Sequence, residues 1–440
     1  MLVGVDVGAT DAGAVLTDGR EVLTAVTGPA APSFADGVAG VLRELVRADP
    51  RAATARAVTV GTAGFETAVA EARGLARTGC VRLCATEAES APPLSGWPAA
   101  LRGAVGEHAF PCGGGHEFDG RPLRPLDEDE LGRIAGVLSA RGIDAVAITS
   151  VFSPVNGRAE LAAAAFLRDR LPTARISVSH EIGSIGLLER ENATIVNAAL
   201  LPLADGLAAA LAREVEAVIP DASVHLVQND GTVMELSFAR RYPVFTFWAG
   251  FTCAVRGAAL LSGHADCVVV DVGAATTTVG VAGGGYPRHA RQDVDLAGVR
   301  TNLPRPEAVE LATGTPDAAQ LDEAVLNAVP GAALPVVLVG PGGNAVPASF
   351  EALRPERGEL ARAVGAAGTR IGGEVDRIVS GDPEARRAAV ERAKSLAAQK
   401  AVMAGAAEAT VRVIEVEEMP LAYLPGDFVR LRVKAVGDLG

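Results

Sequence analysis

The sequence predicts an α/β protein made of two similar lobes that face each other. Segments with helical spacing alternate with short apolar, β-rich runs along most of the 440 residues, which is the pattern of an α/β architecture. Residues 4–10 (GVDVGAT) are also repeated at 270–277 (VDVGAATT), each time as an apolar strand that ends in Asp-Val-Gly-Ala before a threonine. A repeat half a chain apart indicates two related lobes instead of a tandem array.

Composition excludes several classes of partner and site. With 49% hydrophobic residues the chain can bury two or three domain cores, and its net charge of -13 repels nucleic acid and anionic membranes. No apolar run approaches the roughly 20 residues that cross a bilayer, and the first residues lack a basic signal segment. We therefore expect a cytoplasmic protein with no nucleic-acid and no membrane partner. The six histidines show no HxxxH or HxH spacing, so we expect any metal to arrive with a nucleotide.

Residues 1–178 are predicted to form the N-terminal lobe. They open with a three-stranded meander and continue as alternating helices and strands. Between about 91 and 125, proline and glycine pairs interrupt any regular pattern, so we expect a turn-rich excursion there. The expected strands are 2–7, 14–17, 21–26, 57–61, 79–83, 145–149 and 175–179, and the expected helices are 34–47, 65–76, 127–141 and 159–171.

Residues 179–440 are predicted to form the second lobe. Residues 185–211 have mainly helical character, although Pro202 should break or restart the helix. A strand at 224–227 runs into a turn at 229–231, and a helix begins around Gly250. Strands at 267–271 and 277–281 then repeat the opening meander.

The two copies of the repeat carry the residue types that could hold a polyphosphate between two hairpins. Glycine lets backbone N–H groups approach phosphate oxygens, threonine hydroxyls donate further bonds, and an aspartate at the strand end can hold Mg2+. A single copy would more often be a plain turn, whereas two copies in matching strand context favour the phosphate role. The candidate cofactor-binding residues are Asp6, Gly8, Thr10, Gly273 and Thr276, and the candidate metal ligands are Asp6 and Asp271.

A third glycine-rich loop, at 338–344, follows an apolar run that is expected to form a strand. Its glycines Gly342 and Gly343 could cradle an adenosine. A tight turn between a strand and a helix explains the same glycines equally well.

Long stretches of the chain resemble the hydantoinase/5-oxoprolinase A family, a branch of the actin-like ATPases that includes ATP-dependent openers of cyclic amides. The most specific stretches are 151–156 (VFSPVN), 179–183 (SHEIG), 186–194 (GLLERENAT), 228–232 (QNDGT) and 420–426 (PLAYLPG). The resemblance implies a duplicated actin-like (ribonuclease H-like) ATPase fold with two lobes around a cleft. It also implies that the two hairpins bind the phosphates and the metal of a nucleotide.

The resemblance further implies a substrate site beside the cleft. Glu189, Arg190 and Asn192 could position a substrate there, and His180 could carry a proton because histidine titrates near neutral pH. Each residue also has a simpler interpretation. A Glu-Arg-Glu-Asn run on a helix often forms a solvated face with internal pairing, and a histidine that follows a strand is often a hydrogen-bonded structural residue.

The chain departs from the family pattern in its phosphate loops. The acid that usually ends the first hairpin is replaced by Gly13, and the acid of the second hairpin is replaced by Thr278. The segment at about 303–334 is shortened. Loss of one preorganised electrostatic group commonly costs on the order of 100- to 1,000-fold in rate, so several losses together could abolish turnover.

Three functional hypotheses remain open. The first is a hydantoinase/oxoprolinase A-like subunit that uses ATP and Mg2+ to open or hydrolyse a small cyclic amide, such as a hydantoin or a lactam. The second is a non-catalytic subunit that scaffolds or regulates a hydantoinase B-like or other catalytic chain. The third is a small-molecule enzyme that works without ATP. We expect a homo-oligomer, or a hetero-oligomer with the B-like or accessory chain.

Overall fold

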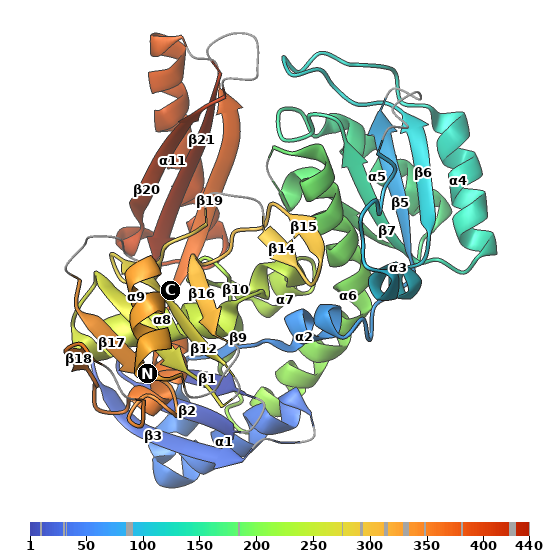
Figure 1. Cartoon of the computed structure of the whole chain (residues 1–440). Coiled ribbons are helices and arrows are strands. Elements are labelled where there is room, and N and C mark those ends of the chain that lie inside the picture. The colour runs from blue at the N-terminus through green and yellow to red at the C-terminus, as the bar shows by residue number, and fades with distance from the viewer. Residues whose placement is uncertain are drawn as a thin grey trace.

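The computed structural model has three regions: a base with two sheets, a parallel-sheet unit and a C-terminal arm (Figure 1). The described residues are 1–8, 11–29, 31, 33–84, 91–183, 185–274, 276–290, 294–311, 316–328, 334–346, 349–379, 382–421 and 428–439. In Figure 1 the arm and the parallel-sheet unit stand on opposite sides of the long helix α6, above the base.

The larger sheet of the base has nine strands and continues into the arm. In sheet order they are β20 (Arg412–Pro420), β21 (Val429–Gly437), β19 (Arg370–Val379), β10 (Thr232–Glu235), β9 (Ser223–Val227), β4 (Ala57–Gly61), β1 (Leu2–Val7), β2 (Asp11–Thr17) and β3 (Val22–Pro29). The adjacent strands β1, β2 and β3 pair antiparallel, which confirms the predicted meander. The sheet takes strands from both sides of position 178, and the proposed domain boundary there stays a prediction.

The second sheet of the base repeats the topology of the first. Its strands are β13 (Tyr286–Pro287), β12 (Thr277–Gly283), β11 (Cys267–Val272), β17 (Val336–Val339) and β18 (Ala352–Leu353), with β16 (Ala308–Leu311) paired to β12. β1 is antiparallel to β2 and parallel to β4, and β11 is likewise antiparallel to β12 and parallel to β17. The hairpins β1–β2 and β11–β12, called the first and second hairpin below, are therefore equivalent.

Two helices pack directly against each other between these sheets. α8 (Ala249–Ser262) lies against β11, β12 and β17, whereas α10 (Ala361–Ala367) lies against β1, β2 and β4. A Cβ on Gly257 would lie 1.8 Å from the carbonyl oxygen of Ala361, and one on Gly365 would lie 1.9 Å from that of Cys253. Only glycine allows the two backbones to approach this closely.

The parallel-sheet unit has four strands in the order β6 (His108–Gly113), β5 (Thr78–Cys84), β7 (Ala145–Ser150) and β8 (Arg175–Val178). All three strand pairs are parallel. The segment 91–125, expected to be rich in turns, contains β6 and the helix α3 (Ala99–Val105). Pro111 is tolerated in β6 because β6 is an edge strand, where a missing N–H costs no ladder bond.

The long helix α6 (Leu187–Glu216) continues through Pro202, so the predicted break is wrong. A proline in a helix removes an internal hydrogen bond and disturbs the preceding turn. The missing bond is the one to the carbonyl of Ala198, while the neighbouring carbonyl of Ala199 accepts a bond from the N–H of Ala76 at 2.8 Å, which ties this turn to the rest of the protein. By length and composition α6 could cross a membrane, contrary to expectation, but 56% of its apolar window is buried inside the protein, as in a core helix.

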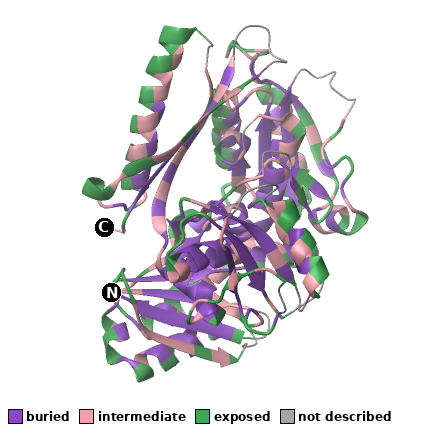
Figure 2. Cartoon of the chain, turned by 60° about the vertical axis from the view of Figure 1, so that its left-hand side comes forward, coloured by how far each residue is buried: buried purple, intermediate pink, exposed green. Residues whose placement is uncertain are grey.

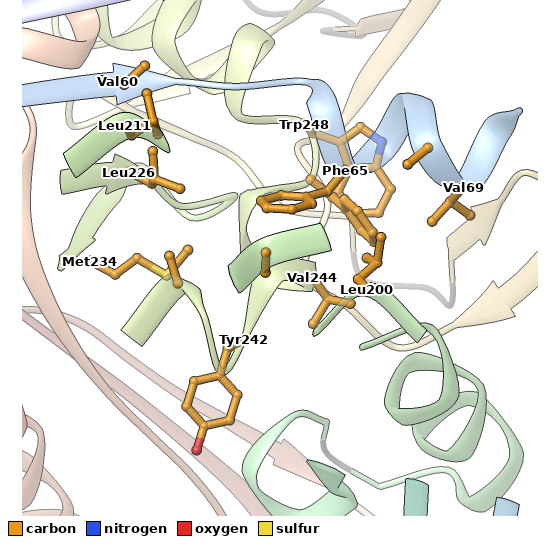
Figure 3. Packing of buried hydrophobic residues seen from close by; sticks show 14 of the residues in the cluster. Val60, Phe65, Val69, Leu200, Leu211, Leu226, Met234, Tyr242, Val244 and Trp248 are labelled. Atoms are coloured by element: carbon orange, nitrogen blue, oxygen red, sulfur yellow. The ribbon is translucent and has the colours of Figure 1, made fainter. Parts of the chain in front are cut away.

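The main core lies where α6 meets the first sheet and the helix α2 (Gly64–Ala70). In Figure 3, Phe65, Leu200, Val244 and Trp248 converge from three segments of the chain. Figure 2 shows the strands of the base largely buried, whereas the helix of the arm is mostly accessible. The remaining long helices are α1 (Phe34–Ala48), α4 (Glu128–Ala140), α5 (Arg158–Arg170), α9 (Ala318–Ala328) and α11 (Pro383–Met403).

Candidate functional site

The strand-end aspartates of both hairpins lie near one arginine, and the three side chains are called the hairpin junction. Asp6 is on β1, Asp271 is on β11, and Arg362 reaches Asp271 from α10. The Nε and Nη2 atoms of Arg362 donate to Oδ2 of Asp271 at 2.9 and 2.6 Å. The Asp271 side chain is fully buried. Its Oδ1 atom has no hydrogen-bond partner among the described residues.

The charges of the junction are coupled. Burial raises the pKa of Asp6 from 3.8 to about 6, and the negative charges of Asp271 and Asp11 add to the rise while Arg362 opposes it. The negative charge of Asp271 in turn raises the pKa of Arg362, so this guanidinium stays protonated. The junction thus contains its own permanent cation.

The junction does not fit a Mg2+ site as it stands. Mg2+ requires several oxygen ligands in near-octahedral geometry, and the described residues include no group of three or more His, Cys, Asp or Glu side chains that could hold a metal. Gly13 lies directly opposite Asp6, and Thr278 lies directly opposite Asp271. A Cβ on Gly13 would lie 2.6 Å from Cδ2 of Leu360, so an acid at position 13 would need that side chain to move.

The turns of the two hairpins have the same internal hydrogen bond. The N–H of Gly8 donates to the carbonyl of Asp11, and the N–H of Gly273 donates to the carbonyl of Thr276, both at 2.9 Å. Thr276 is exposed. The candidate Thr10 lies outside the described residues, as does most of the family-like stretch 420–426.

The third glycine-rich loop packs closely against the end of β11. A Cβ on Gly342 would lie 2.5 Å from Cγ1 of Val272, and one on Gly343 would lie 2.8 Å from the carbonyl oxygen of Val339. Gly340 has a φ of +84° and would place a Cβ 2.6 Å from Oδ1 of Asp271. Contacts within the protein therefore explain these glycines, which favours the tight-turn interpretation.

A large groove lies apart from the junction, between the parallel-sheet unit, the base and the arm. Its volume is about 2270 Å3. Its walls include 153–157 and 180–183 after β7 and β8, the turn 228–230, and parts of β19, β20 and β21. Among the residues described, those that line the groove do not include Asp6, Asp271 or Arg362.

The candidate His180 lines this groove and has a buried acidic partner. Its Nδ1 atom lies 2.6 Å from Oε2 of Glu160, whose side chain is fully buried at the start of α5. Sequence reasoning missed Glu160, because a glutamate in the first turn of a helix normally needs no partner. Glu160 lies on α5, and α5 comes to lie beside the end of β8 only because β7 and β8 are neighbours in the sheet.

The other three candidates lie on the first turns of α6. Arg190 is buried and donates to the hydroxyl of Ser179 at 2.9 Å and to the carbonyl of Ser150 at 2.7 Å. Asn192 accepts a bond from Nε1 of Trp97 at 2.8 Å and donates to the carbonyl of Arg300 at 2.8 Å. Glu189 forms an ion pair with Arg300 at 3.4 Å. The structure brings Arg190 beside the His180 network, whereas Glu189 and Asn192 join α6 to neighbouring loops.

A charged cluster on the opposite wall of the groove was not predicted. The buried Lys434 lies 2.9 Å from Oδ2 of Asp230, and Arg432 pairs with Glu374 at 2.8 Å. His289 lies nearby, and burial together with the charges of Lys434 and Arg432 lowers its pKa from 6.5 to about 4. Arg432 and Glu374 are 58 residues apart in the sequence, and Lys434 and Asp230 are 204 residues apart. No local sequence pattern could therefore predict these pairs.

Two facing lobes with equivalent hairpins, joined through two closely packed helices, define the actin-like ATPase class of fold. Residues 2–171 match the family model of the hydantoinase/oxoprolinase N-terminal region, and residues 190–333 match that of hydantoinase/oxoprolinase. The chain belongs to the hydantoinase/oxoprolinase family, as its sequence indicated.

Solved structures support the same fold. The ATP-dependent caprolactamase from Pseudomonas jessenii is similar with a TM-score of 0.77 and 15% identity, over 100% of this chain and 88% of that chain. Nucleotide-free acetone carboxylase, from a study of ATP-dependent acetone carboxylation, is similar with a TM-score of 0.71 and 11% identity over the same shares. Among curated protein sequences none matches significantly. The predicted actin-like fold is confirmed.

Proposed function

We propose that this chain is an A-type subunit of the hydantoinase/oxoprolinase family that does not use Mg2+-bound ATP at its hairpin junction. The observation that carries the proposal is the pair of hydrogen bonds from Arg362 to Oδ2 of the buried Asp271. A cation of the protein stands where the retained aspartates would otherwise hold a metal.

The buried ion pair favours the arginine over an added metal. Breaking a buried ion pair by removing one partner typically costs about 3–5 kcal/mol, because a charge is left uncompensated. Mg2+ at Asp271 would have to displace Arg362 from Oδ2 or place its charge beside the guanidinium, and it would also need further oxygen ligands, while Gly13 and Thr278 offer no carboxylate. Binding of Mg2+-ATP would have to offset both costs.

The proposed role is that of a cytoplasmic subunit that scaffolds or regulates a hydantoinase B-like or other catalytic chain. The edge of the large sheet supports a partner surface. β20 is the outermost strand, and an unpaired strand edge is a ready site for association. Val413 and Val416 of β20 and Met403 at the end of α11 have apolar side chains that are 38%, 41% and 82% accessible.

Calorimetry with Mg2+-ATP tests the proposal. We expect no saturable binding at up to millimolar nucleotide, and we expect a second chain to be retained in stoichiometric amount when the protein is purified from its natural host. Micromolar binding that disappears in both Asp6→Ala and Asp271→Ala would refute the proposal. Circular dichroism of each variant would verify that the loss is not caused by unfolding.

ATP- and Mg2+-dependent opening of a cyclic amide is the second candidate function. It is favoured by the equivalent positions of Asp6 and Asp271 on the two hairpins, and by the similarity to an ATP-dependent caprolactamase. Under this alternative, phosphate release from ATP would be stimulated by hydantoin, caprolactam or 5-oxoproline in the presence of the partner chain. A phosphate-release assay with each amide separates the two candidates.

A further inference from the structure

The groove ends at the carboxyl edge of the parallel sheet. In open α/β sheets, ligands bind in the crevice outside the carboxyl ends of the strands. Here the segment 153–157 follows β7 and the segment 180–183 follows β8, and both line the groove. The side chains at this edge therefore lie where open α/β sheets bind their ligands.

Glu160 is fixed at this edge by four hydrogen bonds. It accepts from the backbone N–H groups of Ser150 at 2.7 Å and His180 at 2.9 Å. It also accepts from the hydroxyl of Ser179 at 2.5 Å and from Nδ1 of His180 at 2.6 Å. Burial opposes the charge, but the bonds from His180 and Ser179 outweigh burial and hold the pKa of Glu160 below its usual value. The carboxylate is thus ionised and immobile.

This arrangement determines which nitrogen of His180 carries the proton. An ionised carboxylate only accepts hydrogen bonds, so Nδ1 of His180 is the donor and Nε2 of the neutral ring is an acceptor. Among the described residues, no protein group hydrogen-bonds Nε2. The ring lies over Gly157, where a Cβ would be 2.7 Å from Cδ2 of the ring. The His180 side chain retains 19% of its exposure, at the wall of the groove.

The charges around His180 make its ring a stronger base than usual. Burial alone lowers the pKa of His180. The hydrogen bond and the negative charge of Glu160 together raise this pKa by more than burial lowers it, so the net shift is upward. Glu181 on the same turn adds to the rise, and Arg190 on α6 opposes it. An ionised carboxylate behind an imidazole stabilises the imidazolium that forms when the outer nitrogen takes a proton.

We propose that His180 is a proton acceptor for a ligand bound in the groove and that Glu160 is its positioning residue. The proton leaves an O–H or N–H group of the ligand, or of a water beside it, and binds Nε2. The electron pair of the broken bond stays on the ligand or water oxygen or nitrogen. This assignment goes beyond the proposed function and does not depend on whether the hairpin junction binds a nucleotide.

The part of the groove beside His180 suits an uncharged polar ligand. Several of the charged side chains on its far wall are paired with each other, as Arg432 is with Glu374 and Arg430 is with Asp376. A charged ligand that bound these paired side chains would have to disrupt a pair, whereas an uncharged ligand can use the open Nε2 atom and the backbone of 180–183.

Acylation of histidines with diethyl pyrocarbonate, followed by mass spectrometry, tests the assignment. The reagent is small and uncharged and attacks only unprotonated imidazole nitrogen. We expect His180 to react at a rate comparable to the exposed His264 at alkaline pH, and its reactivity to fall with a midpoint above pH 6.5 as the pH decreases. In Glu160→Gln we expect the midpoint to fall by at least about one pH unit, a tenfold loss of proton affinity.

The matched control is Glu181→Gln, which removes a neighbouring charge but keeps the bond to Glu160. Its midpoint should fall by less than half as much. Because Glu160→Gln could fail to fold, nitrogen-15 NMR of the unmodified protein provides a measurement without substitution. We expect the Nδ1–H tautomer of His180. An Nε2–H tautomer, an unreactive His180, or an unchanged midpoint in folded Glu160→Gln would each overturn the assignment.

A pair of alkylating reagents tests the charge of the ligand. We compare neutral iodoacetamide with anionic iodoacetate, and take the rate at His180 relative to that at His264 for each reagent. An equal or larger ratio for iodoacetamide supports an uncharged ligand. A tenfold preference of His180 for iodoacetate would show that the groove selects anions and would overturn that part of the proposal.

Discussion

At the hairpin junction an arginine gives two N–H groups to one buried aspartate, whereas at the groove a histidine gives only one of its two nitrogens to a buried glutamate. Arg362 is a permanent cation, so the charge of Asp271 is balanced inside the protein at every physiological pH. His180 can gain or lose a proton and has its second nitrogen open to the groove. The ion pair of the junction is thus closed within the protein, whereas the histidine at the groove keeps one nitrogen for a ligand.

Removing the cation of the junction should have the largest effect. Arg362→Met leaves the buried Asp271 without its partner, so we expect a loss of about 3–5 kcal/mol in the free energy of unfolding. Urea denaturation at pH 7 measures this loss. In the double variant with Asp271→Asn, most of the loss should be recovered. A loss below about 1 kcal/mol would mean that the junction is not held by this pair.

Acidification should affect the two regions in opposite directions. Asp6 has a folded pKa of about 6 against an ordinary 3.8, so its contribution to stability is full below pH 3.8 and is lost as pH rises through 6. His289 has a folded pKa of about 4 against 6.5, so its contribution is full above pH 6.5 and is lost as pH falls through 4. At 1.36 kcal/mol per unit of pKa, the contribution is at most about 3 kcal/mol for Asp6 and about 3.4 kcal/mol for His289.

The variants Asp6→Asn and His289→Gln separate these contributions. Between pH 7 and pH 4, the wild type should gain stability relative to Asp6→Asn and lose stability relative to His289→Gln. Urea denaturation at pH 4.5, 5.5 and 7 gives both differences. The same sign for both variants would contradict the contrast between the regions.

Filling the position opposite Asp6 should have a smaller effect. In Gly13→Ala the new Cβ would lie 2.6 Å from Cδ2 of Leu360, so Leu360 must change rotamer or α10 must shift. We expect a loss of about 1–2 kcal/mol, in the range for overpacking a core. Gly28→Ala on β3, where the nearest atom is 3.4 Å away, is the matched control. Thermal denaturation that shows no difference between the two variants would contradict this packing.

The smallest effect is expected at Glu189. Its partner Arg300 is 68% exposed, so Glu189→Ala should change the free energy of unfolding by no more than about 1 kcal/mol. Arg190→Met, one residue away, should cost several times more because Arg190 is buried within the network of Ser179 and Ser150. Parallel urea denaturation tests the ratio. A larger loss for Glu189→Ala would show that this side chain has a role beyond its surface ion pair.

The sequence was sufficient to predict the lobes but not the partners at the site. β1 and β11 carry their strand signal and their aspartates in the same short segment, so local pattern and fold agree. The contact of Arg362 with Asp271 spans 91 residues, and that of His180 with Glu160 spans 20. Both depend on which strands become neighbours. Local propensity was misleading at Pro202, where tertiary packing keeps α6 continuous.

The order of strands in the large sheet also has a consequence for biosynthesis. β1 to β3 emerge from the ribosome first, but their sheet is extended by β9 and β10 after some 200 further residues and by β19 to β21 only after residue 370. Lys434 then reaches back to Asp230. Contacts between such distant segments slow folding, and the incomplete sheet keeps an open edge during synthesis. We therefore expect the nascent chain to depend on chaperones until residues 370–437 have been added.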